Sequence, residues 1–206
     1  GRPARAGCAH GGGAQWNNLV EDAVKPLAKK YPVSIAWGMA DPKTLQESIS
    51  QLESEGVTRI VAVPLFISRH SMVIRQTEFL LGLRDELADP PMPSMDHSDG
   101  SMMSGTMNHA QHSGHMMEKA ELKPLKKKAS IILTHALDDN QVVAGILYDR
   151  IAELSTNPSN ETIILVAHGP NGEKDNRGWI INLESLSKKI QAIQKSNGQI
   201  YKQIFA

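Results

Sequence analysis

The chain has 206 residues, of which 40% are hydrophobic, and this is enough to build a core in one large or two small domains. Its 22 basic residues balance 22 acidic ones, so no overall field attracts nucleic acid or an anionic membrane, and a small molecule is the expected partner. The single cysteine, Cys8, excludes an internal disulfide and a cysteine-based zinc site, and no apolar run approaches the ~20 residues that span a bilayer.

Strand and helix patterns alternate along most of the chain, which predicts an α/β fold with a parallel, doubly wound sheet. The strand that would precede His10 is the weakest, because it lacks aliphatic side chains. The run Arg59–Ile67 is continuously apolar, which is typical of a parallel strand buried on both faces. Asp41 and Pro42 mark a helix start as N-cap and first helical residue. In chain order we expect a helix over 16–30, a strand over 33–37, a helix over 42–55, a strand over 59–67, a helix over 73–87, a strand over 129–133, a helix over 139–154, a strand over 162–167, a helix over 176–195 and a strand over 199–205.

Residues 88–128 interrupt this alternation. Seven of the nine methionines and four of the eight histidines lie between Pro90 and Glu118, among small and polar residues that cannot bury enough surface to offset chain entropy. We interpret the segment as a flexible insertion. It would either capture metal through thioethers and imidazoles or serve only as a low-complexity linker. Its histidines are His97, His109, His112 and His115.

An Ala-His-Gly unit occurs twice, each time after a candidate strand and before a helix with a tryptophan. The first is Ala9-His10-Gly11 before Trp16, and the second is Ala167-His168-Gly169 before Trp179. If the units are repeats, the second is incomplete, because nothing after it corresponds to the apolar run 63–66. We therefore expect one full lobe and part of another. The expected lobes are residues 1–158, which include the insertion, and residues 159–206.

Histidines follow four of the predicted strands, and three of them, His10, His70 and His168, are the first candidates for a site. His10 and His168 would lie at the carboxyl ends of strands beside helix starts, where open α/β sheets bind their ligands. His70 comes just after the apolar run 59–67 and would reach the same sheet edge as His10. Two imidazoles that converge there would form an open site for a divalent ion and could accept protons near neutral pH. The structural alternative is a loop histidine that only hydrogen-bonds a nearby carbonyl.

Two further patterns allow other interpretations. His135, Asp138 and Asp139 follow a predicted strand, where they would either line the same cleft or, for the aspartates, cap the next helix. The run His10-Gly11-Gly12-Gly13 matches the oxyanion loop of esterases. That fold also needs a Gly-x-Ser-x-Gly nucleophile turn, which the sequence lacks, so acyl transfer is disfavoured.

Four motifs occur in an order and at a spacing that together resemble the sirohydrochlorin cobaltochelatase family, the class II tetrapyrrole chelatases. The resemblance covers nearly all of the chain outside the insertion and implies a chelatase-like fold of related α/β lobes. It also implies insertion of a divalent ion, usually cobalt and in relatives nickel or iron, into a sirohydrochlorin-type tetrapyrrole without a nucleotide, as in cobalamin biosynthesis. The motifs are Ala9-His10-Gly11-Gly12 with Trp16-Asn17, Ala36-Trp37-Gly38-Met39-Ala40-Asp41, Val63-Pro64-Leu65-Phe66-Ile67-Ser68 and Leu165-Val166-Ala167-His168-Gly169-Pro170.

The resemblance also implies roles for single residues. His10 and His70 correspond to the histidines that hold the metal and take up pyrrole protons, although the family's second histidine usually lies a couple of residues further along. Backbone N–H groups at the helix starts, together with Arg69 or Arg75, would meet the carboxylates of the macrocycle. The residues expected to bind the tetrapyrrole are Gly11, Gly12, Ser68, Arg69, Ser71, His168 and Gly169.

A second hypothesis assigns the chain to a different class. It would bind or deliver metal through the Met- and His-rich segment, with His97, His109, His112 and His115 as ligands and no chelatase activity. Under either hypothesis we expect no nucleic-acid or membrane partner and leave a homo-oligomer open. The expected compartment is the cytoplasm; the chain starts at Gly1 rather than at a methionine, so an exported form is left open as well.

Overall fold

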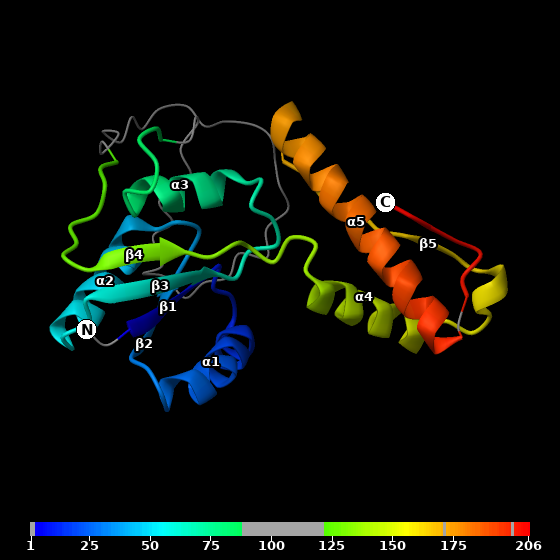
Figure 1. Ribbon diagram of the computed structural model, residues 1–206, viewed down its shortest axis with the longest axis horizontal. Coiled ribbons are helices and arrows are strands. Elements are labelled where there is room, and N and C mark those ends of the chain that lie inside the picture. Colours follow the sequence, from blue (N-terminus) through cyan, green and yellow to red (C-terminus); the bar gives the residue numbers. More distant parts are fainter. Residues whose placement is uncertain (1–2, 88–121, 171, 199) are drawn as a thin grey trace. The chain divides into compact units, whose positions relative to one another are not determined.

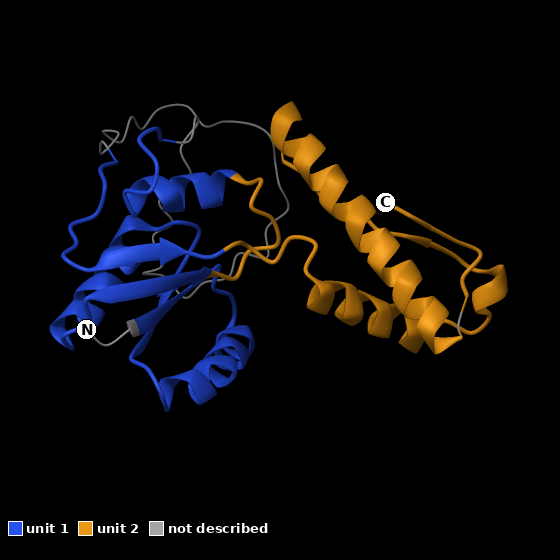
Figure 2. Cartoon of the chain, in the orientation of Figure 1, with its two compact units in different colours: residues 1–63, 72–134 blue, residues 64–71, 135–206 orange. Residues whose placement is uncertain are grey.

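The computed structural model describes residues 3–87, 122–170, 172–198 and 200–206 (Figure 1). The chain forms two compact units, which Figure 2 distinguishes by colour. Unit 1 comprises residues 1–63 and 72–134, and unit 2 comprises residues 64–71 and 135–206. The short segment 64–71 therefore belongs to unit 2, although both of its neighbours in the chain belong to unit 1.

Unit 1 is built on a four-stranded sheet with the strand order β2-β1-β3-β4, in which β1 pairs with β2 and β3 with β4 in parallel. This arrangement confirms the predicted α/β class with a parallel sheet flanked by helices. Its elements are β1 (Pro3–Ala9), α1 (Ala14–Ala28), β2 (Val33–Trp37), α2 (Pro42–Ser54), β3 (Arg59–Pro64), α3 (Met72–Leu80) and β4 (Ser130–Leu133).

The weak first strand is an interior strand of this sheet. Ala4, Ala6 and Cys8 on one face of β1 are all buried. Their small side chains leave room for the larger side chains of α2, among them Ile49 and Leu52, to pack against the sheet. Burial also raises the pKa of the Cys8 thiol to about 12, so it remains a protonated, unreactive core residue. The absence of aliphatic residues therefore reflects close packing and not a missing strand.

Strand β3 ends earlier than its apolar sequence predicts. Ile60 and Ala62 are buried, whereas Val61 and Val63 are only half-buried, so burial on both faces is incomplete. Pro64 is the last strand residue and has no backbone N–H to offer the sheet. Helix α3 likewise ends at Leu80 rather than near residue 87, because Gly82 with φ +64° reverses the chain.

The predicted start of α2 is confirmed. Asp41 is the N-cap, and its side chain accepts hydrogen bonds from the backbone N–H groups of Lys43 and Thr44 at 2.8 and 3.0 Å. Pro42 occupies the first helical position. At the other end of the helix, Glu53 accepts hydrogen bonds from the N–H groups of Lys128 and Ala129, where β4 begins. These bonds, chiefly the one from Ala129, hold the pKa of Glu53 below its usual value.

Glu53→Gln tests this contact through the pH dependence of stability. Because the pKa of Glu53 is lowered in the folded state, the charged carboxylate stabilises the fold above its ordinary pKa of 4.5, and this stabilisation is lost as the pH falls through the folded pKa. At pH 7 we expect the variant to have a free energy of unfolding lower by about 1 kcal/mol, since glutamine keeps an acceptor without the charge. Urea denaturation from pH 7 to 3 should show this difference shrinking below pH 4.5. A difference that stays constant over that range contradicts the assignment.

Unit 2 pairs β5 with β6 in parallel, and α4 and α5 contact each other. The apolar face of α5 forms its core with side chains from α4 and the C-terminal strand. The elements are α4 (Gln141–Leu154), a single 3₁₀ turn (Pro158–Asn160), β5 (Thr162–Ile164), α5 (Glu173–Asn197) and β6 (Gln203–Phe205). The core residues are Ala144, Tyr148, Leu186, Ile190, Tyr201 and Ile204.

The structure contradicts the expected cap of α4 and leaves the expected lobe boundary untested. Asp138 and Asp139 do not cap α4; Asn140 does, and its side chain accepts from the N–H of Val142 at 2.9 Å. The proposed lobe boundary at residue 158 stays a prediction, and the compact units divide elsewhere because α4 packs with α5. No helix in the described part of the chain is long and apolar enough to cross a membrane.

Candidate functional site

His10 follows β1 directly and is exposed to solvent. Its Nδ1 lies 2.8 Å from the carbonyl oxygen of Gly11, and because a carbonyl can only accept, Nδ1 carries the hydrogen in this contact. In the neutral ring, Nε2 then keeps its lone pair for a metal ion or a proton. The turn depends on Gly11, whose φ of +78° is unfavourable for other residues. The contact with Gly11 thus leaves Nε2 as the ring nitrogen of His10 that is open to other partners.

Gly12, two residues after His10, contacts the first turn of α1 (Ala14–Ala28). Gly12 donates its N–H to Oδ1 of Asn17 at 3.0 Å. A Cβ atom at Gly12 would lie 3.1 Å from the indole of Trp16, so the turn favours glycine here as well. The first turn of α1 has no acidic side chain. Its partial positive charge is therefore not offset by a carboxylate of its own.

His168 repeats the geometry of His10 in unit 2. Its Nδ1 lies 2.7 Å from the carbonyl oxygen of Gly169, whose φ is +63°, and the ring is exposed. The ring also contacts the indole of Trp179, with 5.1 Å between the ring centroids. One feature differs from the first loop: α5 begins with Glu173 and Asp175 in its first turn, and these carboxylates disfavour an anion there.

His70 is half-buried in the loop 64–71 of unit 2. Its backbone N–H donates to the hydroxyl of the buried Ser68 at 3.1 Å, and its carbonyl accepts from Nε1 of Trp179 at 2.8 Å. The neighbouring Arg69 binds Asp138 twice, through its backbone N–H and through Nε, each at 2.7 Å. Backbone groups of the loop 64–71 are therefore hydrogen-bonded to the rest of unit 2, at Asp138 and Trp179.

The predicted site residues are divided between the units. His10, Gly11 and Gly12 belong to unit 1; Ser68, Arg69, His70, Ser71, His168 and Gly169 belong to unit 2. Within unit 2, the indole of Trp179 contacts both the His70 backbone and the His168 ring. Among the described residues, no group of three or more His, Cys, Asp or Glu side chains could hold a metal ion. His97, His109, His112 and His115 lie outside the described residues.

The sequence patterns miss two residues that hold the His70 loop and leave the role of a third open. The sequence marks Trp179 only as the helix tryptophan after the second Ala-His-Gly unit, and no pattern points to Gly178. Asp138 was expected to cap a helix or line a cleft, but its carboxylate binds the His70 loop. Its positive φ of +46°, rare for a residue other than glycine, is a backbone feature that no local pattern announces.

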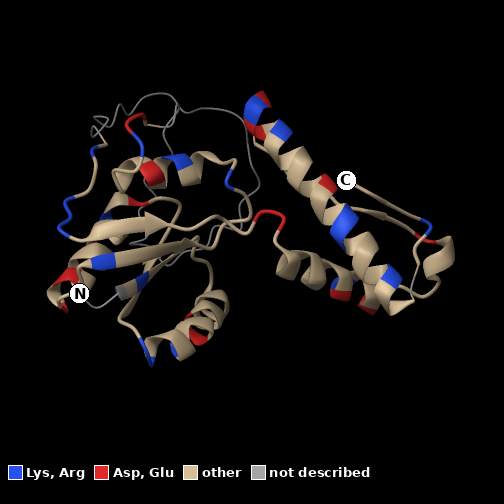
Figure 3. Ribbon diagram, in the orientation of Figure 1, with Lys and Arg blue, Asp and Glu red and all other residues tan. Residues whose placement is uncertain are grey.

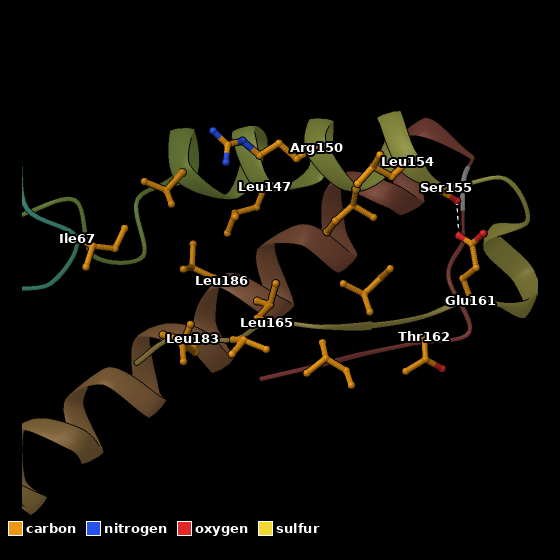
Figure 4. A pocket seen from close by; sticks show the side chains of 16 residues that line it. Ile67, Leu147, Arg150, Leu154, Ser155, Glu161, Thr162, Leu165, Leu183 and Leu186 are labelled. Atoms are coloured by element: carbon orange, nitrogen blue, oxygen red, sulfur yellow. Dashed lines mark hydrogen bonds between the residues drawn. The ribbon is translucent and has the colours of Figure 1, made fainter. Parts of the chain in front are cut away.

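A large groove in unit 2 lies among α4, β5 and α5 and has a volume of about 650 Å³ (Figure 4). It is lined mainly by aliphatic side chains such as Leu147, Leu165 and Leu186. Arg150 is the single basic residue among the described residues that line it. A tetrapyrrole with several carboxylates would find few partners there, and none of the predicted site residues that the structure describes lines it.

Comparison with known proteins identifies the family. The CbiX family model matches residues 8–154, which is more than half of the chain and includes His10 and His70. His168 lies beyond the matched residues. A search of curated proteins finds no match. From the match, and from the parallel α/β sheet of unit 1, we conclude that this chain belongs to the CbiX family, the class II tetrapyrrole chelatases, which insert a divalent metal ion without a nucleotide.

Proposed function

We propose that the protein inserts cobalt into a sirohydrochlorin-type tetrapyrrole, with His10 at the metal ion. The observation that carries the proposal is the imidazole of His10, whose Nδ1 is engaged by Gly11 and whose ring is exposed, within the segment that matches the CbiX model. Sirohydrochlorin is preferred because the motifs around His10 and before His70 resemble those of the cobaltochelatases. Nickel and iron are the other ions considered, since imidazole ligands suit all three.

Metal insertion places two demands on the protein. Two pyrrole N–H protons must leave the macrocycle while a dication enters, so a base that is active near neutral pH is required. The metal ligands must also release the ion to the macrocycle, which excludes a closed, fully coordinated site. Exposed imidazoles can meet both demands: the Nε2 lone pair of His10 can bind the ion weakly and, once the ion has passed to the macrocycle, accept one of the two protons, while His70 or solvent would take the other.

His70 and the loop residues complete the proposal. His70 would supply the second imidazole to the ion. The carboxylates of the macrocycle would meet Arg69, whose side chain is 44% exposed despite its bond to Asp138 through Nε, and the N–H groups at the start of α1. The full set proposed to contact the tetrapyrrole is Gly11, Gly12, Ser68, Arg69, Ser71, His168 and Gly169.

The test mixes the purified chain with sirohydrochlorin and Co²⁺, without a nucleotide, and follows the absorption spectrum of the macrocycle. We expect insertion to be faster than the reaction without protein, and parallel assays with Ni²⁺ and Fe²⁺ rank the metals. A rate equal to the protein-free reaction for all three ions refutes the proposal. A version with His97, His109, His112 and His115 replaced by alanine addresses the alternative of metal delivery: calorimetric metal binding that disappears in this variant, with no insertion by either protein, favours delivery.

A further inference from the structure

Asp138 is a buried carboxylate whose contacts join three segments of unit 2. It is 4% exposed and accepts from the N–H and from Nε of Arg69, both at 2.7 Å, and from Nδ2 of Asn182 on α5 at 3.3 Å. Its own N–H donates to the carbonyl of Ile67 at 2.8 Å. Asp138 and Asp139 form the acidic segment that precedes α4 in Figure 3. Asp138 thus holds the loop 64–71 from both sides of Ser68.

The His70 ring rests on the next part of the same assembly. A Cβ atom built on Gly178 would lie 2.5 Å from Cγ of His70, so the ring lies directly against the α5 backbone at this glycine. Trp179, the next residue, donates its indole N–H to the His70 carbonyl at 2.8 Å. Two contacts therefore fix the position of the imidazole: the hydrogen bond at the His70 carbonyl holds the backbone, and the ring packs against α5 at Gly178.

We propose that Asp138 is a positioning residue for His70, acting through the Arg69 backbone, and that Gly178 provides the surface on which the imidazole rests. The inference depends on the proposed function for its consequence in catalysis, because it takes His70 as a metal ligand. The physical basis is that groups outside the coordination sphere set ligand orientation, and that their loss typically costs ~10 to 100-fold in metal affinity or activity. Arg69, bound at Nε, is oriented by the same carboxylate.

Asp138→Asn is the principal variant and Asp139→Asn its matched control. Asp139 is the adjacent aspartate and also binds α5, through Ser185 and Lys189, but none of its hydrogen bonds in the structure reaches the loop 64–71 of the described chain. In a background with the four insertion histidines replaced by alanine, calorimetry with Co²⁺ alone should show about tenfold weaker binding for Asp138→Asn. Binding to Asp139→Asn should stay within twofold. Equal losses in both variants overturn the proposal.

A double-mutant cycle distinguishes positioning from a general structural effect. If Asp138 acts on the metal through His70, Asp138→Asn should cause no further loss of Co²⁺ affinity once His70 is alanine. The insertion assay adds a second measurement: kcat should fall, and the KM for sirohydrochlorin should rise as well, because the same carboxylate orients Arg69, which is proposed to meet the carboxylates of the macrocycle. Additive losses of Co²⁺ affinity contradict the proposal. If the wild-type chain shows no insertion at all, the proposed function fails, while the calorimetric cycle still decides the role of Asp138.

Gly178→Ala tests the same inference in a variant that is expected to fold, because alanine favours a helix. The added methyl group would meet the His70 ring, so we expect the imidazole NMR signals of His70 to shift and Co²⁺ affinity to fall severalfold. Gly145→Ala on α4 is the control, since outside its own stretch of helix no heavy atom of the described residues lies within 4 Å of the added Cβ. Unchanged His70 signals in Gly178→Ala overturn the proposed contact.

Discussion

His10→Ala should reduce metal insertion to the rate of the protein-free reaction, a loss of at least about 100-fold if the imidazole acts as both metal ligand and base. The side chain is exposed and, within the described part of the chain, its one hydrogen bond is to the adjacent Gly11, so the substitution should leave the fold of unit 1 unchanged. The rate of the absorption change with Co²⁺ and sirohydrochlorin measures the effect, and circular dichroism checks the fold.

Two comparisons make the result specific to the imidazole. His10→Gln keeps polar atoms at this position but supplies no base, so it should be nearly as slow as the alanine variant. Gln15→Ala changes an exposed residue in the first turn of α1 and should retain the wild-type rate. Insertion by His10→Ala at more than half the wild-type rate would remove His10 from the mechanism.

Ile190→Ala should lower the stability of unit 2 by about 2–5 kcal/mol, the range measured for large-to-small changes in well-packed cores. Ile190 on α5 is fully buried at 0% exposure, in the cluster that also contains Tyr148, Leu186 and Ile204. Unit 2 has a small core and many exposed aliphatic residues, so a loss of this size is a large part of a typical domain stability. Partial unfolding of unit 2 at room temperature is therefore expected.

Trp179 provides the measurement, because it is the one tryptophan within the residues of unit 2, and Trp16→Phe with Trp37→Phe leaves it as the sole tryptophan, whose emission is followed. Ile181→Ala is the matched control on the same helix, since Ile181 is 63% exposed and its truncation should change stability by no more than about 0.5 kcal/mol. Similar denaturation midpoints for Ile190→Ala and Ile181→Ala would show that this cluster is not the core of unit 2.

Local chemistry in the sequence determined many features of the fold. Asp41 and Pro42 predicted the start of α2 correctly, because a cap needs only a side-chain acceptor and the next few N–H groups. The glycine after each of His10 and His168 likewise takes a positive φ, and each histidine makes the same contact with that glycine's carbonyl. Alternating strand and helix patterns were sufficient to predict the parallel α/β sheet of unit 1.

Other predictions failed where a distant segment competes with a local pattern. The apolar run 59–67 predicted a strand through Ile67, but residues after Pro64 turn into a loop whose carbonyls at Phe66 and Ile67 accept from Leu137 and Asp138. The sequence of β1 has a low local preference for a strand, because its small residues become favourable there only once α2 packs on them.

The sequence by itself determined the family, the order of strands and helices, and the exposed histidine loop at His10, because each of these depends on residues that are close in the chain or on motifs in a set order. Only the tertiary structure decided how His70 is held. Its contacts join Arg69 to Asp138 across 69 positions and His70 to Trp179 across 109. No periodicity or capping rule connects residues so far apart, since such pairs form only after the chain has folded.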